Sequence, residues 1–219
     1  MIYVLYGDPS INSFQGNATA AWNNNYVTVH HLKDGTTLTP TDATANGNNG
    51  TSNGATATAG KINGAANFNG APQYIGIGTS EAIGVTGNMT IEAWVNPSDY
   101  ANYNGIISKT TGGYPKPFDF YLNQSNGVPQ LVRGSGTVWG YSAVGASAAP
   151  ATNTWSHVVV TINGGTVTHY LNGVANGSGA LSGDKCCKEI LVGVLTHLSL
   201  TNISNILRMG SQYCFGSIG

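Results

Sequence analysis

Residues 154–174, TWSHVVVTINGGTVTHYLNGV, have the pattern of a complete β-hairpin with a second turn behind it. Two runs rich in Val, Thr and Tyr flank Asn163-Gly164-Gly165, and Asn and Gly supply the positive φ that a tight hairpin turn requires. The two-residue period of a strand divides the first run between two faces, Ser156, Val158, Val160 and Ile162 on one and Trp155, His157, Val159 and Thr161 on the other. Asn172-Gly173 predicts the next turn.

Composition favours one all-β domain. The chain of 219 residues is long enough for one sizeable core. Its 31 glycines and recurring Asn-Gly dipeptides divide it into short strands. Charged residues make up 8% of the chain and the net charge is −1, so there is no basic stripe to bind phosphates or anionic lipids. No apolar run approaches the ~20 residues of a membrane span. We therefore expect no nucleic-acid partner and no membrane insertion.

Alternation of apolar and polar residues predicts further short strands. Residues 35–59 are rich in Thr, Asn, Gly and Ala, and we expect a long surface loop there; an Ala/Ser-rich connection is expected at 143–150. The expected strands lie at residues 26–32, 65–68, 73–78, 89–95, 105–109, 118–122, 130–133 and 138–141, with final strands at 206–212 and 215–218.

Several ordered motifs together resemble the laminin-G-like, concanavalin A-like lectin/glucanase family. The stretch 154–174 resembles it through a Trp that enters a Val-rich strand, a Gly-rich turn and a Tyr-Leu-Asn-Gly strand. GKINGAANFNGAPQYIGIG at 60–78 and NMTIEAWVNP at 88–97 match the same pattern, and DATANGNNGT at 42–51 resembles the turn after the first strand. The resemblance covers about residues 26–183 and implies an all-β, antiparallel two-sheet jelly-roll β-sandwich.

The resemblance also suggests domain boundaries. LYGDPS at residues 5–10 resembles the last strand and turn of a small domain that often precedes this family in secreted microbial proteins. We therefore expect residues 1–25 to be a remnant of a preceding domain or linker, with a short native strand as the alternative. The jelly roll is expected to span 26–219.

The C-terminal part departs from the family pattern. Residues 184–200 bring cysteines, charges and a Leu-rich run where the family has a polar loop; a reading-frame disturbance near Asp184 and an insertion helix at 188–200 are alternative interpretations. We also expect a truncated C-terminus, because the family continues beyond the position of Gly219 with an acidic residue and an apolar strand. The cysteines are odd in number, Cys186, Cys187 and Cys214, and form no disulfide framework for the body of the domain.

A sugar-binding surface needs aromatic faces for stacking and polar groups for the hydroxyls. The face opposite the aliphatic one offers such groups on each of three expected strands, Glu92 and Trp94, Asp119 and Tyr121, and Trp139 and Tyr141. On one concave sheet these would form a glycan site, with Trp139 as the first candidate because Gly140 leaves its ring open. The alternative is that the rings pack against a covering loop.

A glycosidase needs two carboxyl groups about 5 to 9.5 Å apart. Glu92 and Asp119 are the nearest pair by pattern, provided that their strands are neighbours. The glucanase relatives carry a cluster of acids at alternate positions on one strand, which this chain lacks. Solvated carboxylates without a chemical role are the alternative.

The family resemblance also implies a calcium site in the loop after the first strand. Asp42, Asn46 and Asn48 supply hard oxygen atoms there, which suit an ion with about six to eight oxygen ligands. The C-terminal acid that the family adds is missing. Zinc is not expected, because His157 and His169 have no cysteine or acid at ligand spacing.

These observations lead to one functional hypothesis with two alternatives. The first is a non-catalytic module of a larger extracellular or cell-surface microbial protein, which binds a glycan or cell-surface polysaccharide through the concave sheet. A glycoside hydrolase that uses Glu92 and Asp119 is the second, and a structural or adhesive repeat without a ligand is the third.

Overall fold

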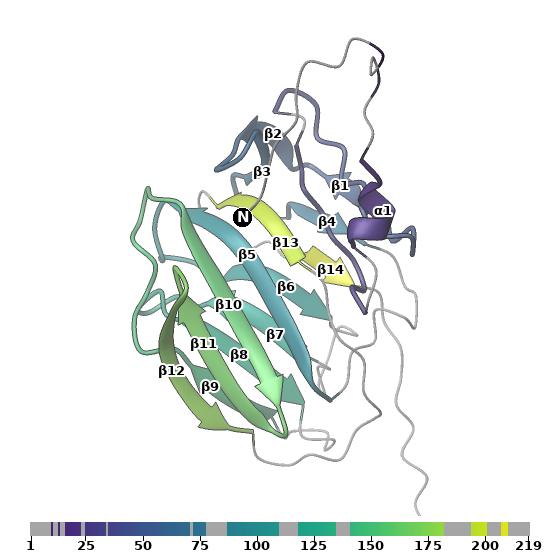
Figure 1. The fold of residues 1–219 in the computed structure, drawn as a ribbon. Helices are drawn as coiled ribbons and strands as arrows, with labels where there is room; N and C mark the ends of the chain where they lie inside the picture. Colours follow the sequence, from purple (N-terminus) through teal and green to yellow (C-terminus); the bar gives the residue numbers. More distant parts are fainter. Residues whose placement is uncertain are drawn as a thin grey trace, which may run out of the picture.

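The computed structural model describes residues 10, 13, 16–22, 25–33, 35–70, 72–77, 87–109, 118–134, 141–181, 194–200 and 207–209. Figure 1 shows strands arranged in two layers, with one short helix beside them. The elements are α1 (Ala18–Ala21), β1 (Thr51–Asn53), β2 (Thr56–Ala59), β3 (Gly64–Phe68), β4 (Tyr74–Gly76), β5 (Met89–Pro97), β6 (Asn104–Lys109), β7 (Phe118–Leu122), β8 (Pro129–Gly134), β9 (Tyr141–Gly145), β10 (Ser156–Asn163), β11 (Thr166–Leu171), β12 (Val174–Ala180), β13 (Val194–Leu200) and β14 (Leu207–Met209).

The strands form two seven-stranded sheets. Sheet A has the order β12-β11-β10-β5-β13-β3-β2, and sheet B has the order β1-β4-β14-β6-β7-β8-β9. Strand pairs are antiparallel except those that involve β13 and β14, which run parallel to their neighbours. The predicted two-sheet β-sandwich is thus confirmed, with parallel pairing where the last strands enter each sheet.

Alternating apolar side chains from both sheets fill the space between them. Ile91, Ala93 and Val95 of β5 are completely buried, and so are Phe118 and Phe120 of β7. Fully burying one large apolar side chain contributes roughly 1.5–3 kcal/mol. Because the side-chain period of a strand is two, the inward residues also determine which residues point outward.

The predicted hairpin is confirmed as β10 and β11. Asn163 pairs with Thr166 across a two-residue loop in which Gly164 and Gly165 have φ of 55° and 81°. Positive φ at both central residues is the signature of the type I′ turn, whose twist matches that of the strands. The required conformation therefore falls on the two glycines, and Asn163 belongs to the strand.

Residues 26–32 were predicted to be the first strand, and this prediction is wrong. The segment makes an isolated bridge to Asp42 but belongs to no strand. The Ala43 N–H donates to the Val29 carbonyl, and side chains supply further hydrogen bonds: the Val29 N–H donates to Asp42, and the Val27 carbonyl accepts from Asn48. The following loop thus takes the place of a neighbouring strand.

Three other boundaries also differ. The expected loop at 35–59 contains β1 and β2, whose exposed or half-buried residues need no large apolar side chains. The expected connection at 143–150 begins three residues too early, because β9 runs to Gly145. Residues 194–200 form β13, so an insertion helix across 188–200 is wrong for this part. The cysteines and residues 215–218 lie outside the described residues.

His169 of β11 lies completely buried between the sheets. Its Nε2 donates to the Val144 carbonyl of β9 at 2.9 Å, and its ring stacks on Phe120 at 6.1 Å between centroids. Burial lowers the pKa of His169, and the hydrogen bond to Val144 only partly offsets this. The folded protein therefore keeps this imidazole neutral.

We predict that the buried His169 makes the folded protein less stable as the pH falls. The unfolded chain takes up a proton near the ordinary pKa of 6.5, and the folded chain only at lower pH. Stability should therefore fall as pH drops below 6.5. In His169→Gln this pH dependence should be shallower by up to about 1.4 kcal/mol per pH unit, measured by urea denaturation between pH 7 and pH 5. Equal slopes for the two proteins would contradict the prediction.

Candidate functional site

The predicted site residues do not share one face. Glu92 and Trp94 belong to β5 of sheet A, whereas Asp119 and Tyr121 belong to β7 of sheet B. The prediction of a single glycan site that includes all of them is therefore wrong. Sequence patterns show which residues of a strand point outward, but they do not show which strands lie side by side.

One further member of the predicted set, Tyr141, lies at the edge of sheet B. Tyr141 is the first residue of β9, and its backbone pairs with Gly134. Trp139 lies outside the described residues. The role assigned to both from the sequence stays a prediction.

Glu92 and Asp119 cannot act as a carboxylate pair in this fold. Their strands are not neighbours, and the residues that flank them, such as Ile91 and Phe120, point into the space between the sheets. The two carboxylates thus lie on opposite outer faces of a sandwich whose sheets pack about 10 Å apart. Their separation exceeds the 5 to 9.5 Å or so that glycosidase carboxylates need.

On the outer face of sheet B, Tyr103 and Tyr121 stack with 4.3 Å between ring centroids and an interplanar angle of 28°. The Tyr103 hydroxyl donates to the buried Asp119 carboxylate, and the Tyr121 hydroxyl donates to Gln130. Gly105 is opposite Tyr121 in β6, so no β6 side chain competes for the space beside this ring. Both rings are half-buried. We call Tyr103, Asp119, Tyr121, Asn123 and Gln130 together the tyrosine face.

The tyrosine face is continued by two amides. Asn123 Nδ2 donates to Gln130 Oε1 at 3.2 Å, and Gln130 pairs with Tyr121 across β7 and β8. One amide oxygen thus accepts from both neighbours, which fixes the orientation of its side chain. The result is an aromatic pair with ordered hydrogen-bonding groups beside it.

The outer face of sheet A carries a different cluster, which we call the tryptophan face: Lys61, Glu92, Trp94 and His157. His157 pairs with Trp94 across β10 and β5, and their ring centroids are 5.2 Å apart. His157 Nε2 lies 3.4 Å from Glu92 Oε2, and 27% of each side chain is exposed. Lys61, from the turn between β2 and β3, places its Nζ 5.4 Å from the Trp94 ring centroid.

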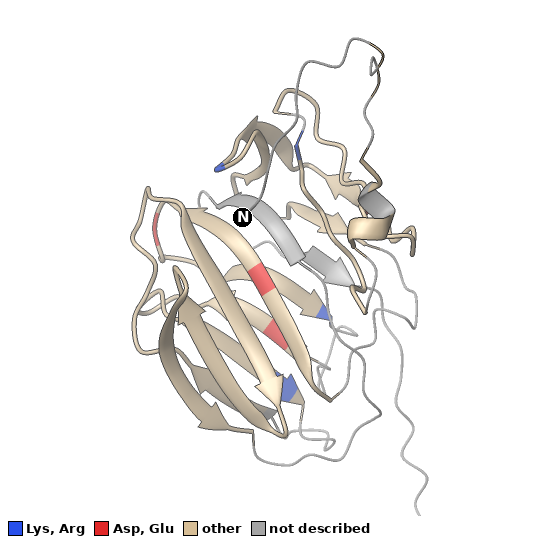
Figure 2. Ribbon diagram, viewed as in Figure 1, with Lys and Arg blue, Asp and Glu red and all other residues tan. Residues whose placement is uncertain are grey.

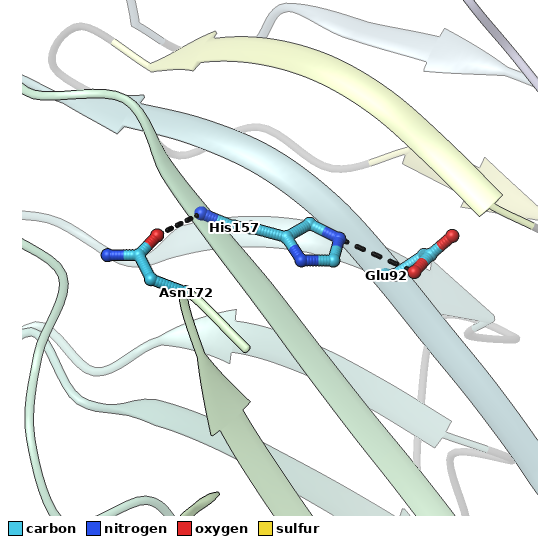
Figure 3. Close-up of polar contacts among 3 residues, drawn as sticks. All are labelled: Glu92, His157 and Asn172. Atoms are coloured by element: carbon cyan, nitrogen blue, oxygen red, sulfur yellow. Dashed lines mark hydrogen bonds and ion pairs between the residues drawn. The ribbon is translucent and has the colours of Figure 1, made fainter. Parts of the chain in front are cut away.

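Asn172 fixes the backbone of His157, as Figure 3 shows. Its Oδ1 accepts from the His157 N–H at 2.8 Å, and its own N–H donates to the His157 carbonyl at 2.8 Å. This contact requires a left-handed conformation at Asn172, with φ of 50°, followed by Gly173 with φ of 80°. The predicted turn at this dipeptide is confirmed, and it holds His157 beside Glu92.

We predict that the two parts of this contact can be separated by substitution. Asn172→Gly keeps the left-handed conformation and loses one hydrogen bond, which should cost about 1 kcal/mol. Asn172→Ala keeps a Cβ in that conformation without the amide that makes it acceptable for Asn, and should cost roughly 2 kcal/mol. Urea denaturation of both variants tests this order, and a less stable Asn172→Gly would contradict it.

The predicted calcium residues do lie together, in a hydrogen-bonded loop. Asp42 Oδ1 accepts from the backbone N–H groups of Val29 and Thr44, at 3.0 and 2.9 Å. Its Oδ2 accepts from the Thr44 hydroxyl at 2.8 Å and from the Asn48 N–H at 2.9 Å. Asn46 Nδ2 donates to the carbonyls of residues 26 and 27. The loop is thus held to the segment before it by these side chains.

This arrangement does not fit a calcium ion on Asp42. A carboxylate has about four lone-pair positions, and here all of them accept hydrogen bonds. Calcium coordination would require Asp42 to give up at least one of these hydrogen bonds. Calcium binding at this loop stays a prediction from the sequence. Burial raises the pKa of Asp42, but hydrogen bonds from Val29, Thr44 and Asn48 outweigh it and hold the pKa below its usual value.

We predict that Asp42→Asn destabilises the protein by on the order of 3 kcal/mol, because its amide group would face two N–H or O–H donors. The stability that the Asp42 carboxylate contributes is present above its ordinary pKa of 3.8 and is lost as pH falls through the lower folded-state value. The variant should therefore lose less stability in strong acid.

Asp99→Asn is the matched control, because Asp99 lies half-buried in the loop after β5 and its carboxylate accepts two hydrogen bonds, from Ala101 and Ser98. Its melting temperature should change little. A calcium-dependent rise in melting temperature that Asp42→Asn abolishes would instead show ion binding at this loop.

Sequence reasoning missed the contacts that the candidate residues make with residues of neighbouring strands and turns. His157 and Glu92 are far apart in sequence and meet only through the β5–β10 register. Lys61 reaches Trp94 from a turn, and Gln130 meets Tyr121 through the β7–β8 register. The alternation of each strand was a usable signal for outward residues, but the register was not readable from it.

Charged side chains are few in the described structure, and Figure 2 shows them scattered over both sheets. In this part of the chain, His, Cys, Asp and Glu do not gather in the groups of three that could hold a metal ion. No helix among the described residues has the length and apolar character needed to cross a membrane.

The family model described as the concanavalin A-like lectin/glucanases superfamily matches residues 69–189, more than half of the chain. No curated protein and no solved structure matches the chain. The matched range begins after the 42–51 motif and includes β4 to β12.

Proposed function

Because the chain belongs to the concanavalin A-like lectin/glucanase superfamily, we propose that it is a non-catalytic glycan-binding or adhesion module. It would act outside the cell or at the cell surface, as part of a larger microbial protein, and hold its neighbours near a polysaccharide. The observation that supports this most is the stacked pair of Tyr103 and Tyr121 on the outer face of sheet B.

The tyrosine face has the properties that sugar recognition needs. A sugar stacks its C–H groups on an aromatic ring and directs its hydroxyls to nearby polar groups. Tyr103 and Tyr121 each expose part of a ring, and Gln130 and Asn123 lie beside them with their amides held by hydrogen bonds. The core residues on the opposite side of β7 keep this surface rigid, so little ordering entropy is lost on binding.

Binding is favoured over hydrolysis by the position of the carboxylates. Asp119 is buried beneath Tyr103 and accepts its hydroxyl hydrogen bond. Glu92, which the hydrolase hypothesis would pair with it, is on the other sheet. The tyrosine face therefore offers a surface for stacking and lacks the acid pair of that hypothesis.

We predict that Tyr121→Ala weakens retention on soluble polysaccharides by about tenfold or more, equivalent to at least ~1.4 kcal/mol, because a stacking ring is lost. Affinity electrophoresis over a polysaccharide panel, with and without calcium, measures this. Tyr26→Ala is the matched control, because Tyr26 is also half-buried and packs against Trp22 in a segment that belongs to neither sheet. Trp139→Ala tests the remaining sequence prediction in the same screen.

Melting temperatures should show that each variant is folded. If Tyr121→Ala is folded and is retained as strongly as the wild type, the tyrosine face is not the glycan site. Release of sugar from any polysaccharide by stringently purified protein, lost in Asp119→Asn, would overturn the non-catalytic assignment.

A further inference from the structure

We propose that the tryptophan face is a second ligand site, which binds one neutral hexopyranose residue against the Trp94 indole. It lies on sheet A, whereas the tyrosine face lies on sheet B. The two surfaces are outer faces of the same sandwich and point in opposite directions. The second site therefore does not depend on glycan binding at the tyrosine face.

The platform for the sugar is held by the core beneath it. Trp94 is half-buried, and its neighbours Ala93 and Val95 are completely buried on the inner side of β5. His157 stands beside the indole on β10, with its backbone held by Asn172. The indole is thus presented on the outside of a packed strand, and its removal leaves the core side chains in place.

The polar groups around Trp94 have hydrogen-bonding capacity left. In the described part of the chain, Glu92 uses one carboxylate oxygen, at 3.4 Å from His157, and its other oxygen has no protein partner. Among the described residues, the Lys61 ammonium contacts the Trp94 ring and has no hydrogen-bond acceptor. A strong acceptor thus lies near the Trp94 ring and a strong donor lies over it, at the end of the flexible Lys61 side chain, which must swing aside for a sugar to stack on this face.

A pyranose ring matches this arrangement. Its C–H groups stack on an aromatic face, and each of its hydroxyls can both donate and accept. One hydroxyl can donate to Glu92 while a neighbouring hydroxyl accepts from Lys61. These contacts are charge-assisted hydrogen bonds, which are stronger than those between neutral groups.

The charge of the tryptophan face selects a neutral sugar. Lys61 and Glu92 carry opposite formal charges that offset each other, so the pair gives little net attraction to an anionic or cationic ligand. A uronate that paired with Lys61 would bring its carboxylate near Glu92, and an amino sugar that paired with Glu92 would bring its ammonium near Lys61, so repulsion offsets the attraction in each case. A neutral hexose avoids both.

The test uses the purified full chain and methyl glycosides of glucose, galactose and mannose, with glucuronate as the charged counterpart. Saturation-transfer NMR detects binding, and isothermal titration calorimetry gives the affinity. Trp94→Ala should weaken binding of the preferred neutral glycoside at this site at least tenfold, and Glu92→Gln should weaken it several-fold with little change in shape. Thr168→Ala, on neighbouring β11, is the matched control.

The same titrations in a Tyr121→Ala background separate the two proposals. Residual hexose binding that Trp94→Ala then removes supports the second site. Binding that Tyr121→Ala abolishes and Trp94→Ala leaves unchanged overturns the second site and supports the tyrosine face; the reverse pattern supports the second site and contradicts the tyrosine face. A wild-type chain that binds no neutral glycoside, or binds glucuronate more tightly, also overturns the second site.

Discussion

The structure depends on the burial of alternating apolar side chains between the two sheets. Ile91, Ala93 and Val95 of β5 meet Phe118 and Phe120 of β7 across the interior, and all are fully excluded from solvent. A strand that commits every second residue to this layer must present the intervening residues outward. The two candidate ligand faces are therefore consequences of core packing, and a one-residue slip in either strand would exchange core and surface.

A feature of the fold could be predicted from the sequence when the residues that form it lie close together in the chain. The type I′ hairpin at Gly164-Gly165 and the inward residues of β5 are local in sequence, and alternation and turn chemistry identified them. The placement of Glu92 and Asp119 on different sheets is a property of strand order, to which no local pattern corresponds. The strand predicted at residues 26–32 is wrong for a related reason. Side chains that come later in the sequence, such as Asp42, form hydrogen bonds with its backbone.

The two faces combine aromatic and polar groups in different ways. On sheet B, the hydroxyls of Tyr103 and Tyr121 are bound to Asp119 and Gln130, so the aromatic pair is fixed by the protein itself. On sheet A, Trp94 lies beneath the Lys61 ammonium and two residues from Glu92 on the same face of β5. A module with both faces active could connect two glycan chains, because its faces point in opposite directions.

We infer that ligands bind to the outward residues of packed strands. The most direct measurement is a titration of the isotope-labelled chain with a neutral oligosaccharide, followed by backbone amide NMR shifts. We predict that the largest shifts fall on two surfaces. One is on β5 and β10 around Trp94 and His157, and the other is on β7 and β8 around Tyr121 and Gln130. Shifts confined to the loop around Asp42, or absent from both faces at saturating sugar, would contradict it.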